Sequence, residues 1–268
     1  MTVIQRNELH SNQIWKRVNQ LRSPIQVIEI NNPVTEIFQW KSLLIEQDEH
    51  VLKIGTDAVL LGTWIPSLSL TPRRILDVGT GSGVLALLLS ESYPNAQIVG
   101  IDTDENAVKL AQANFFKNAH EKNIEARYAN ILQENFEIDD YDLIVSNPPY
   151  YFNQLQSRDI NNNKAKHAIH PPDKWMFGLA KKTLQAGDIC IVVPYDAAFT
   201  WIKSANKFGM YCHHRLNVSS FPSDKLPVRT LLHFNRSLVN PVITSLSIYE
   251  VPNKYTDAYL RLTGIALN

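Results

Sequence analysis

Cysteine is scarce in this sequence, with only Cys190 and Cys212 among its 268 residues. Two cysteines without a metal-type spacing exclude a disulfide scaffold and a cysteine-held metal. Cys190 lies within the apolar run Ile189–Val193, where a thiol serves as a small core side chain. We therefore expect a protein of a reducing compartment, without a metal centre.

Long hydrophobic runs are also absent. No stretch approaches the ~20 apolar residues that span a bilayer, and the first residues contain no apolar segment of the roughly 7–15 residues found in signal peptides. The sequence thus predicts a cytoplasmic protein with no membrane association. A hydrophobic content of 44% over 268 residues is sufficient for one large core, or for one core with an appendage.

Net charge is lacking too, because 26 Lys and Arg residues balance 26 Asp and Glu residues. A neutral total argues against avid nucleic-acid binding. The distribution is less even, since six basic residues and one acid lie between Lys203 and Arg236. A basic C-terminal face suits a surface that follows phosphates, although solvated Lys and Arg side chains give the same pattern.

The sequence does contain a glycine-rich turn after a buried strand. Residues 74–79 are largely apolar, and Gly79, Gly81 and Gly83 then open the apolar helical segment 84–89. Glycines at alternate positions let the backbone turn tightly beside a ligand, and the helix N-terminus supplies free N–H groups. The spacing departs from the dinucleotide fingerprint G-x-G-x-x-G, which disfavours a pyrophosphate ligand.

Two acids accompany this turn. Asp77 precedes the first glycine by two residues, and its charge suits a cationic amine better than a phosphate. Asp102 ends the next apolar run, 25 positions after Asp77. Doubly wound α/β folds that bind nucleotides place the acid that holds the ribose diol at about this distance from the first strand.

Asn147–Tyr150, with the sequence Asn-Pro-Pro-Tyr, directly follows the apolar run 141–146. Each proline fixes its own φ and pushes the preceding residue toward extended geometry, so the strand is expected to end in a rigid turn. The prolines have no N–H group, which leaves nearby carbonyls free to accept from a ligand. With the asparagine side chain and the tyrosine ring, these acceptors suit a planar exocyclic amine, stacked and hydrogen-bonded through its NH₂. Taken alone, Asn-Pro-Pro is also a common structural turn.

The order of elements predicts the fold class. Strands are expected at 74–79, 96–101, 124–129, 141–146 and 189–193, and helices at 84–89, 106–118, 173–184 and 197–208. This alternation is typical of α/β proteins that have a parallel sheet with helices on both faces. Two late strands, 211–218 and 228–234, predict a C-terminal antiparallel hairpin whose loop, Phe221–Pro227, lies on the substrate side.

The acids, the glycine turn and Asn-Pro-Pro-Tyr, in this order, resemble the S-adenosylmethionine-dependent methyltransferases. The Asn147–Tyr150 ending resembles the branch that methylates amino groups of adenine or glutamine. The segment Lys53–Trp64, preceded by Phe38–Lys41, resembles the start of the bacterial tRNA(Val) adenine-N6 methyltransferases. The resemblance covers residues 37–268, a methyltransferase domain, whereas residues 1–36 form an N-terminal extension of unknown role.

The resemblance implies a Rossmann-like class I methyltransferase: an α/β, doubly wound domain with a mostly parallel, seven-stranded sheet and the C-terminal antiparallel hairpin. It implies S-adenosyl-L-methionine as the cofactor and tRNA as the partner. The implied substrate is the N6 amino group of an adenine, the one 3′ of the anticodon of a valine tRNA. No obligate protein partner is implied.

The resemblance also assigns roles to residues. The catalytic turn is Asn147, Pro148, Pro149 and Tyr150. The cofactor-binding residues are Thr56, Asp57, Asp77, Gly79, Gly81, Gly83, Asp102 and Asn130. The expected tRNA contacts are Lys166 and His167, which the resemblance covers, and Arg215, Lys225 and Arg229, which come from the basic C-terminal stretch. Asn130 stands where Asp is frequent in related enzymes, and its amide can still donate to an adenine ring nitrogen.

Two other functions stay open at this point. A carboxamide NH₂ fits the same acceptors as an adenine amine, so an N5-glutamine methyltransferase of a translation factor is one alternative. A non-catalytic RNA-binding protein that kept the fold is the other. The intact acids, glycines and Asn-Pro-Pro-Tyr turn speak against a loss of catalysis.

Overall fold

The structure of the protein is a computed structural model that describes residues 36–48, 51, 53–119, 123–133, 140–148 and 171–265, together with the backbone of residues 27–29. The strands are β1 Val27–Glu29, β2 Glu36–Trp40, β3 Leu43–Gln47, β4 Arg74–Val78, β5 Gln97–Asp102, β6 Ile124–Tyr128, β7 Tyr141–Ser146, β8 Thr183–Pro194, β9 Tyr211–Ser219, β10 Arg229–Asn235, β11 Val242–Ser247, β12 Tyr249–Val251 and β13 Lys254–Tyr255. The α-helices are α2 Thr56–Trp64, α3 Val84–Ser92, α4 Glu105–Asn118, α5 Pro172–Lys182, α6 Ala198–Lys207 and α7 Asp257–Thr263, and the 3₁₀ helices are η1 Ile65–Leu68 and η2 Tyr195–Ala197.

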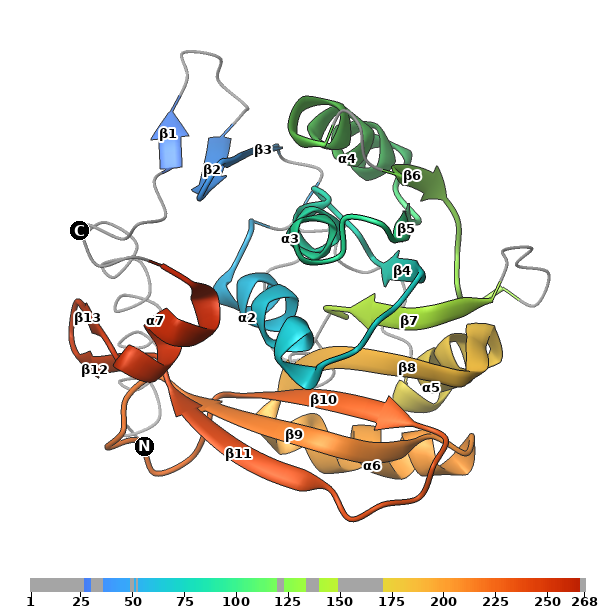
Figure 1. Cartoon of the computed structure of the whole chain (residues 1–268), viewed down its shortest axis with the longest axis vertical. Coiled ribbons are helices and arrows are strands. Elements are labelled where there is room, and N and C mark those ends of the chain that lie inside the picture. The colour runs from blue at the N-terminus through green and yellow to red at the C-terminus, as the bar shows by residue number, and fades with distance from the viewer. Residues whose placement is uncertain are drawn as a thin grey trace, which may run out of the picture.

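Eight of the described strands form one sheet, in the order β11-β9-β10-β8-β7-β4-β5-β6 (Figure 1). β10 pairs antiparallel with both β8 and β9, and the remaining neighbours pair in parallel. The mostly parallel α/β sheet and the antiparallel β9–β10 hairpin confirm the predicted fold class. The predicted number of strands, seven, was wrong by one, because β11 pairs in parallel with β9 at the edge of the sheet.

The sheet is buried on both faces, which explains its continuous apolar strands. Side chains of α2, α3, α4 and α7 pack with the strands into one hydrophobic cluster. Those of α5 and α6 pack into a second cluster. Neighbouring strand residues alternate between the two clusters, as Ile75 and Leu76 of β4 do. The sheet is therefore the middle layer of a three-layer domain (Figure 1).

The register fixes which loops share an edge of the sheet. β4, β5, β7 and β8 are parallel, so their carboxyl ends lie together. Arg229, the first residue of β10, pairs with Pro194 at the end of β8 and with Val218 near the end of β9. The loop Phe221–Pro227 therefore lies at this carboxyl edge, as the sequence predicts.

A separate sheet of β1, β2 and β3 stands beside the domain. Its apolar residues, among them Phe38 and Ile45, belong to the same cluster as α2 and α3. The outer edge of β3 meets α4, where Asn114 and Asn118 bind the backbone of Glu46 and Leu44 through their side-chain amides. The β2–β3 hairpin thus shares its hydrophobic core with the domain that contains the large sheet.

Candidate active site

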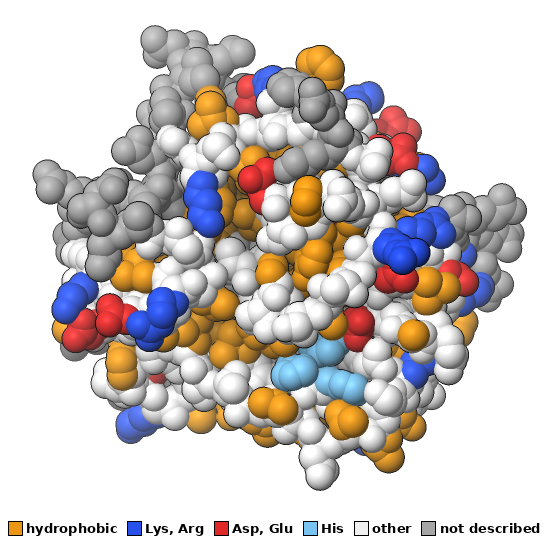
Figure 2. Space-filling view, viewed as in Figure 1, with side chains coloured by type: hydrophobic (Ala, Val, Ile, Leu, Met, Phe, Trp, Pro, Cys, Tyr) orange, Lys and Arg blue, Asp and Glu red, His pale blue; other side chains and the backbone are white. Residues whose placement is uncertain are grey.

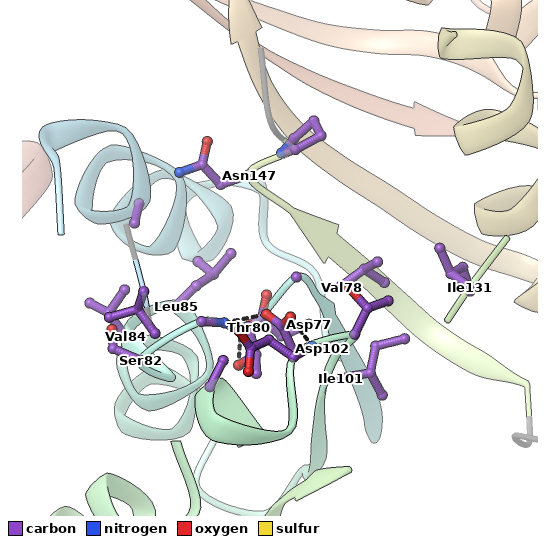
Figure 3. Close-up of a pocket in the computed structure, with 18 of the residues that line it drawn as sticks. Asp77, Val78, Thr80, Ser82, Val84, Leu85, Ile101, Asp102, Ile131 and Asn147 are labelled. Carbon is purple, nitrogen blue, oxygen red and sulfur yellow. Dashed lines mark hydrogen bonds between the residues drawn. The ribbon is translucent and has the colours of Figure 1, made fainter. Parts of the chain in front are cut away.

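A cavity of about 800 Å³ opens at the carboxyl ends of β4, β5 and β7. Figure 3 shows Asp77, Thr80 and Asp102 grouped together, with Asn147 at the end of β7 apart from them. Of the residues predicted to act in the site, the lining includes Asp77, Gly79, Gly81, Asp102, Asn130, Asn147 and Pro148. A crevice at this edge of an open α/β sheet is where such folds bind ligands.

The glycine turn is held by backbone hydrogen bonds and needs glycine at specific places. The N–H groups of Gly79 and Thr80 both donate to the carbonyl oxygen of Ile101, 2.9 Å away. Gly83, the N-cap of α3, has a φ of +84°, and a Cβ there would lie 2.4 Å from the Phe115 ring. Gly81 has a φ of +53° and open space around a Cβ, so its backbone conformation alone requires glycine.

Asp77 is the most perturbed acid of the site. The residue is 1% exposed, and burial raises its pKa from the ordinary 3.8 to about 7, although the Thr80 hydroxyl opposes this by donating to Oδ2 at 2.8 Å. The nearby Asp102 raises the pKa further. A buried carboxylate that ionises only near neutrality is stabilised by a cation. Its position on the cavity wall therefore favours a ligand with a positive charge.

Asp102 is fixed in orientation by two backbone donors. Gly81 N donates to Oδ2 and Asp104 N donates to Oδ1, each at 3.0 Å. A carboxylate has about four lone-pair sites, so both oxygens keep capacity to accept from a ligand hydroxyl. Because Asp102 lines the cavity, it is suited to hold a vicinal diol. Its hydrogen bond with Gly81 N also links the position of the Asp102 carboxylate to that of the glycine turn.

The end of β7 is tied to the end of β4. The Ser146 hydroxyl donates to the carbonyl oxygen of Val78 at 2.7 Å and is completely buried. This bond fixes the point at which the strand ends, so Asn147 and Pro148 enter the cavity wall from a defined direction. Pro149, Tyr150, Lys166 and His167 lie outside the described residues, and their assigned roles stay predictions.

Thr56 and Asp57 are placed beside the cavity rather than in its lining. Gly55 and Ala58, their neighbours, line it. The Asp57 carboxylate instead accepts from Arg229 Nε at 2.8 Å. Gly83 likewise stands behind the wall, against Phe115.

The apolar wall is the part of the site that the motifs missed. It includes Ile54, Leu85, Ile131 and Trp175. Such side chains have the same sequence pattern as core residues. Of these four residues, only Ile54 lies within a segment that the sequence singled out, Lys53–Trp64.

The basic residues of the C-terminal stretch do not form one face. Residues paired in register share a face of the sheet. Arg229 pairs with Val218, which packs with α2 and α3, whereas Arg215 pairs with Leu232, which packs with α5 and α6. On the face seen in Figure 2, the Lys and Arg side chains of the chain as a whole lie scattered, several of them beside acids. Lys225 is exposed in the loop at the carboxyl edge.

In the described part of the chain, no helix has the length and apolar character to cross a membrane. Within the same residues, no group of three or more His, Cys, Asp or Glu side chains is placed to hold a metal ion.

Comparison with known proteins agrees with the geometry. Residues 52–171 match the family model Methyltransferase small domain. A tRNA1(Val) (adenine(37)-N6)-methyltransferase of Haemophilus influenzae is 33% identical over 230 residues, which cover 84% of this chain and 96% of that protein. Proteins of the same name from Phocaeicola vulgatus and Bacteroides thetaiotaomicron are 31% and 32% identical, each over 84% of this chain and over 95% and 94% of their own lengths.

Solved structures share the fold. A predicted O-methyltransferase from Agrobacterium tumefaciens superposes with a TM-score of 0.61 at 15% identity, covering 78% of this chain and 95% of its own. A ribosomal protein L11 methylase from Lactobacillus delbrueckii gives a TM-score of 0.51 at 14% identity, with 72% and 84% covered. These likenesses establish the Rossmann-like methyltransferase architecture.

Proposed function

The chain belongs to the family of bacterial tRNA1(Val) (adenine(37)-N6)-methyltransferases, and we propose that it transfers a methyl group from S-adenosylmethionine to the N6 amino group of an adenine in tRNA. The finer proposal is adenine 37 of a valine tRNA, the position named for the relatives. One observation carries the proposal: a single cavity contains both the acid–glycine–acid set and the Asn147–Pro148 turn.

The cavity residues fit the cofactor. The buried Asp77 carboxylate needs a cation, and the methionine part of S-adenosylmethionine has an amine to supply it. Asp102 is oriented to accept from ribose hydroxyls. The adenine ring of S-adenosylmethionine would lie against Ile131 and receive a hydrogen bond from Asn130, and both residues line the cavity. When bound, the cofactor supplies an electrophilic methyl group on a sulfonium.

The protein's part in the reaction is orientation and polarisation of the amine. An adenine amino group is a weak nucleophile, because its lone pair is delocalised into the ring. The Asn147 side-chain oxygen and the Pro148 carbonyl oxygen would accept hydrogen bonds from the two N–H groups of the amine. These hydrogen bonds would favour the tetrahedral nitrogen of the transition state. Preorganised acceptors of this kind lower a barrier without a strong base. Tyr150 would stack on the base once it is flipped from its neighbours.

The proposed partner is tRNA, which such an enzyme would meet in the cytoplasm. Lys225 at the carboxyl edge is the described basic residue we propose for phosphate contact, together with Lys166 and His167 of the segment after the catalytic turn. The two thiols, Cys190 and Cys212, are both free and buried, in keeping with that compartment.

The proposal is tested by supplying the purified protein with methyl-labelled S-adenosylmethionine and either total tRNA or a protein extract. We expect label in tRNA, recovered as N6-methyladenosine after digestion to nucleosides. Label in a glutamine side chain of a translation factor would instead establish the rival methyltransferase. Cofactor binding without transfer to either would leave a binding protein of this fold.

A further inference from the structure

Arg229 and Asp57 are 172 positions apart in the sequence and form an ion pair in the structure, with Nε and Oδ2 2.8 Å apart. Asp57 lies in the first turn of α2, and Arg229 is the first residue of β10. The side chains are 20% and 36% exposed, so the pair is partly shielded from water. It joins the hairpin at the substrate edge to the helix beside the cavity.

The guanidinium is held in place from its own side as well. Arg229 Nη1 donates to the carbonyl oxygen of Val228 at 2.9 Å, and Val228 N donates to Val218 O at 2.8 Å. The arginine thus projects from a rigid strand start, not from a loose loop. A rigid donor is suited to fixing the position of its acceptor.

The segment that Asp57 fixes is a wall of the cavity. Lys53, Ile54, Gly55 and Ala58 line it, and Asp57 falls between them without lining it. Gly55 is the N-cap of α2 and has no side chain to close the helix end. Ahead of it, Ile54 N donates to the buried Gln47 Oε1 at 2.6 Å. Among the described residues, the wall is therefore held by Gln47 before the helix start and by Arg229 after it, beside the exposed ion pair of Lys53 with Glu36.

The body of α2 is held differently. It packs against α3 so closely that a Cβ at Gly62 would lie 2.9 Å from Leu88 Cβ. This contact fixes the helix axis, while the first turn still depends on its polar anchors. Loss of the ion pair should consequently loosen the cavity wall before it affects the fold.

We infer that Arg229 and Asp57 are a positioning pair, which holds the 53–58 wall of the cofactor site and contacts neither cofactor nor tRNA directly. This inference rests on the proposed function, because the site it concerns is the S-adenosylmethionine site. It gives both residues a role other than the one expected from the sequence, which was cofactor binding for Asp57 and tRNA contact for Arg229. It also ties the start of the substrate-side hairpin to cofactor binding.

The test measures S-adenosylmethionine binding by calorimetry for Asp57→Asn, Arg229→Gln, the double variant, and a swapped variant with Asp57→Arg and Arg229→Asp. We expect each single variant to weaken binding by a similar factor, roughly 3- to 10-fold for a partly exposed charged hydrogen bond. The double variant should be no weaker than either single one. The swapped variant should recover part of the loss.

Kinetics and a matched control separate positioning from general destabilisation. The KM for S-adenosylmethionine should rise while kcat stays near that of the unaltered protein. The control is Lys254→Gln, which breaks the exposed Lys254–Glu250 pair, 2.6 Å apart. It should leave cofactor affinity unchanged.

Three results would overturn the inference. Weakened cofactor binding by Asp57→Asn alone would make Asp57 a direct ligand. Normal cofactor binding by Arg229→Gln, with a shallower salt dependence of tRNA binding, would make Arg229 a phosphate contact. If the unaltered protein bound no S-adenosylmethionine, the proposed function would fail and the inference with it.

Discussion

The completely buried amide of Asn114 donates to the carbonyl oxygen of Ser82 at 2.8 Å, and so ties α4 to the glycine turn. The same side chain donates to Glu46 O and accepts from Glu46 N, each at 2.9 Å. One residue thus joins the β2–β3 hairpin, α4 and the edge of the cavity. The position of the turn depends on residues distant from it in sequence.

Replacing Asn114 should therefore destabilise the protein. Asn114→Leu leaves the buried Ser82 carbonyl and the partly buried backbone groups of Glu46 without this partner, which should lower the free energy of unfolding by about 2–4 kcal/mol. Asn118→Leu is the matched control, because its bonds to Leu44 are exposed and water can replace them. Urea unfolding of both variants checks this. An equal decrease in the free energy of unfolding for both variants would mean that the buried hydrogen bonds of Asn114 stabilise the protein no more than the exposed ones of Asn118.

Asn147→Ala should abolish most methyl transfer while leaving cofactor affinity within a few fold. An acceptor that acts on the amine in the transition state typically contributes ~10²–10³ in rate. Single-turnover transfer to tRNA, with calorimetry of the cofactor alongside, measures both quantities. Near-normal turnover would remove Asn147 from the catalytic role.

Asp102→Ala should weaken S-adenosylmethionine binding by roughly 1.5–3 kcal/mol, the range for hydrogen bonds to a charged group. Asp102 could contribute by contacting the ribose hydroxyls or only by holding Gly81 in place. A 2′-deoxyribose analogue of S-adenosylhomocysteine distinguishes these two contributions, because it lacks one of the hydroxyls. The unaltered protein should prefer the ribose form, and the variant should bind both forms alike. A preference that survives the substitution would place the diol elsewhere.

Cofactor affinity should rise with pH through neutrality. The pKa of Asp77, raised by burial to about 7 in the folded protein, means that below this pH the carboxyl is neutral and cannot pair with an amine. Binding should weaken up to about tenfold per pH unit below 7. Calorimetry from pH 6 to 8 measures this, and Asp77→Asn should bind weakly with a flat profile. A steep profile that persists in Asp77→Asn would assign the titration to another group.

The raised pKa of Asp77 also makes the free energy of unfolding of the cofactor-free protein depend on pH. The folded state keeps the Asp77 proton up to about pH 7, whereas an ordinary carboxyl loses it near 3.8. The folded state thus binds more protons in this window, so the contribution of Asp77 to the free energy of unfolding decreases as pH rises from about 4 to 7.

Lys225→Ala should make the salt dependence of tRNA binding shallower by about 0.7–0.9 in log K against log salt, if the side chain meets one phosphate. Lys207→Ala is the control. Its ammonium pairs with Asp173 at 2.6 Å, at the far end of α6 from the carboxyl edge. Fluorescence anisotropy at several salt concentrations measures both slopes. Equal slopes for the two variants and the unaltered protein would make Lys225 an ordinary solvated side chain.

Local patterns were sufficient to predict much of the parallel core, although β8, expected at 189–193, begins at Thr183. The apolar runs that became β4, β5 and β7, and the glycines after β4, specify their own conformation, so their bounds agree with the structure within one or two residues. β11 was missed because its first four residues are exposed and its pattern does not alternate. α7 is too short for a periodic signal to be distinct.

Long-range polar contacts were beyond reach of the sequence alone. Asp57 and Arg229 each fit a functional pattern separately, and only the folded chain shows that they meet. The segregation of Arg215 from Arg229 follows from strand register, which composition does not encode. The acids and glycines of the cavity were predictable, since their spacing reflects a local strand–turn–helix unit.

The central claim is tested most directly with two valine tRNA transcripts, one with adenine 37 and one with guanine at that position. After reaction with the purified protein and S-adenosylmethionine, mass spectrometry of the nucleosides quantifies N6-methyladenosine. The account predicts about one methyl group per molecule of the adenine-37 tRNA and none in the guanine-37 tRNA. Equal methylation of the two transcripts, or none in either beside methylated protein, would contradict it.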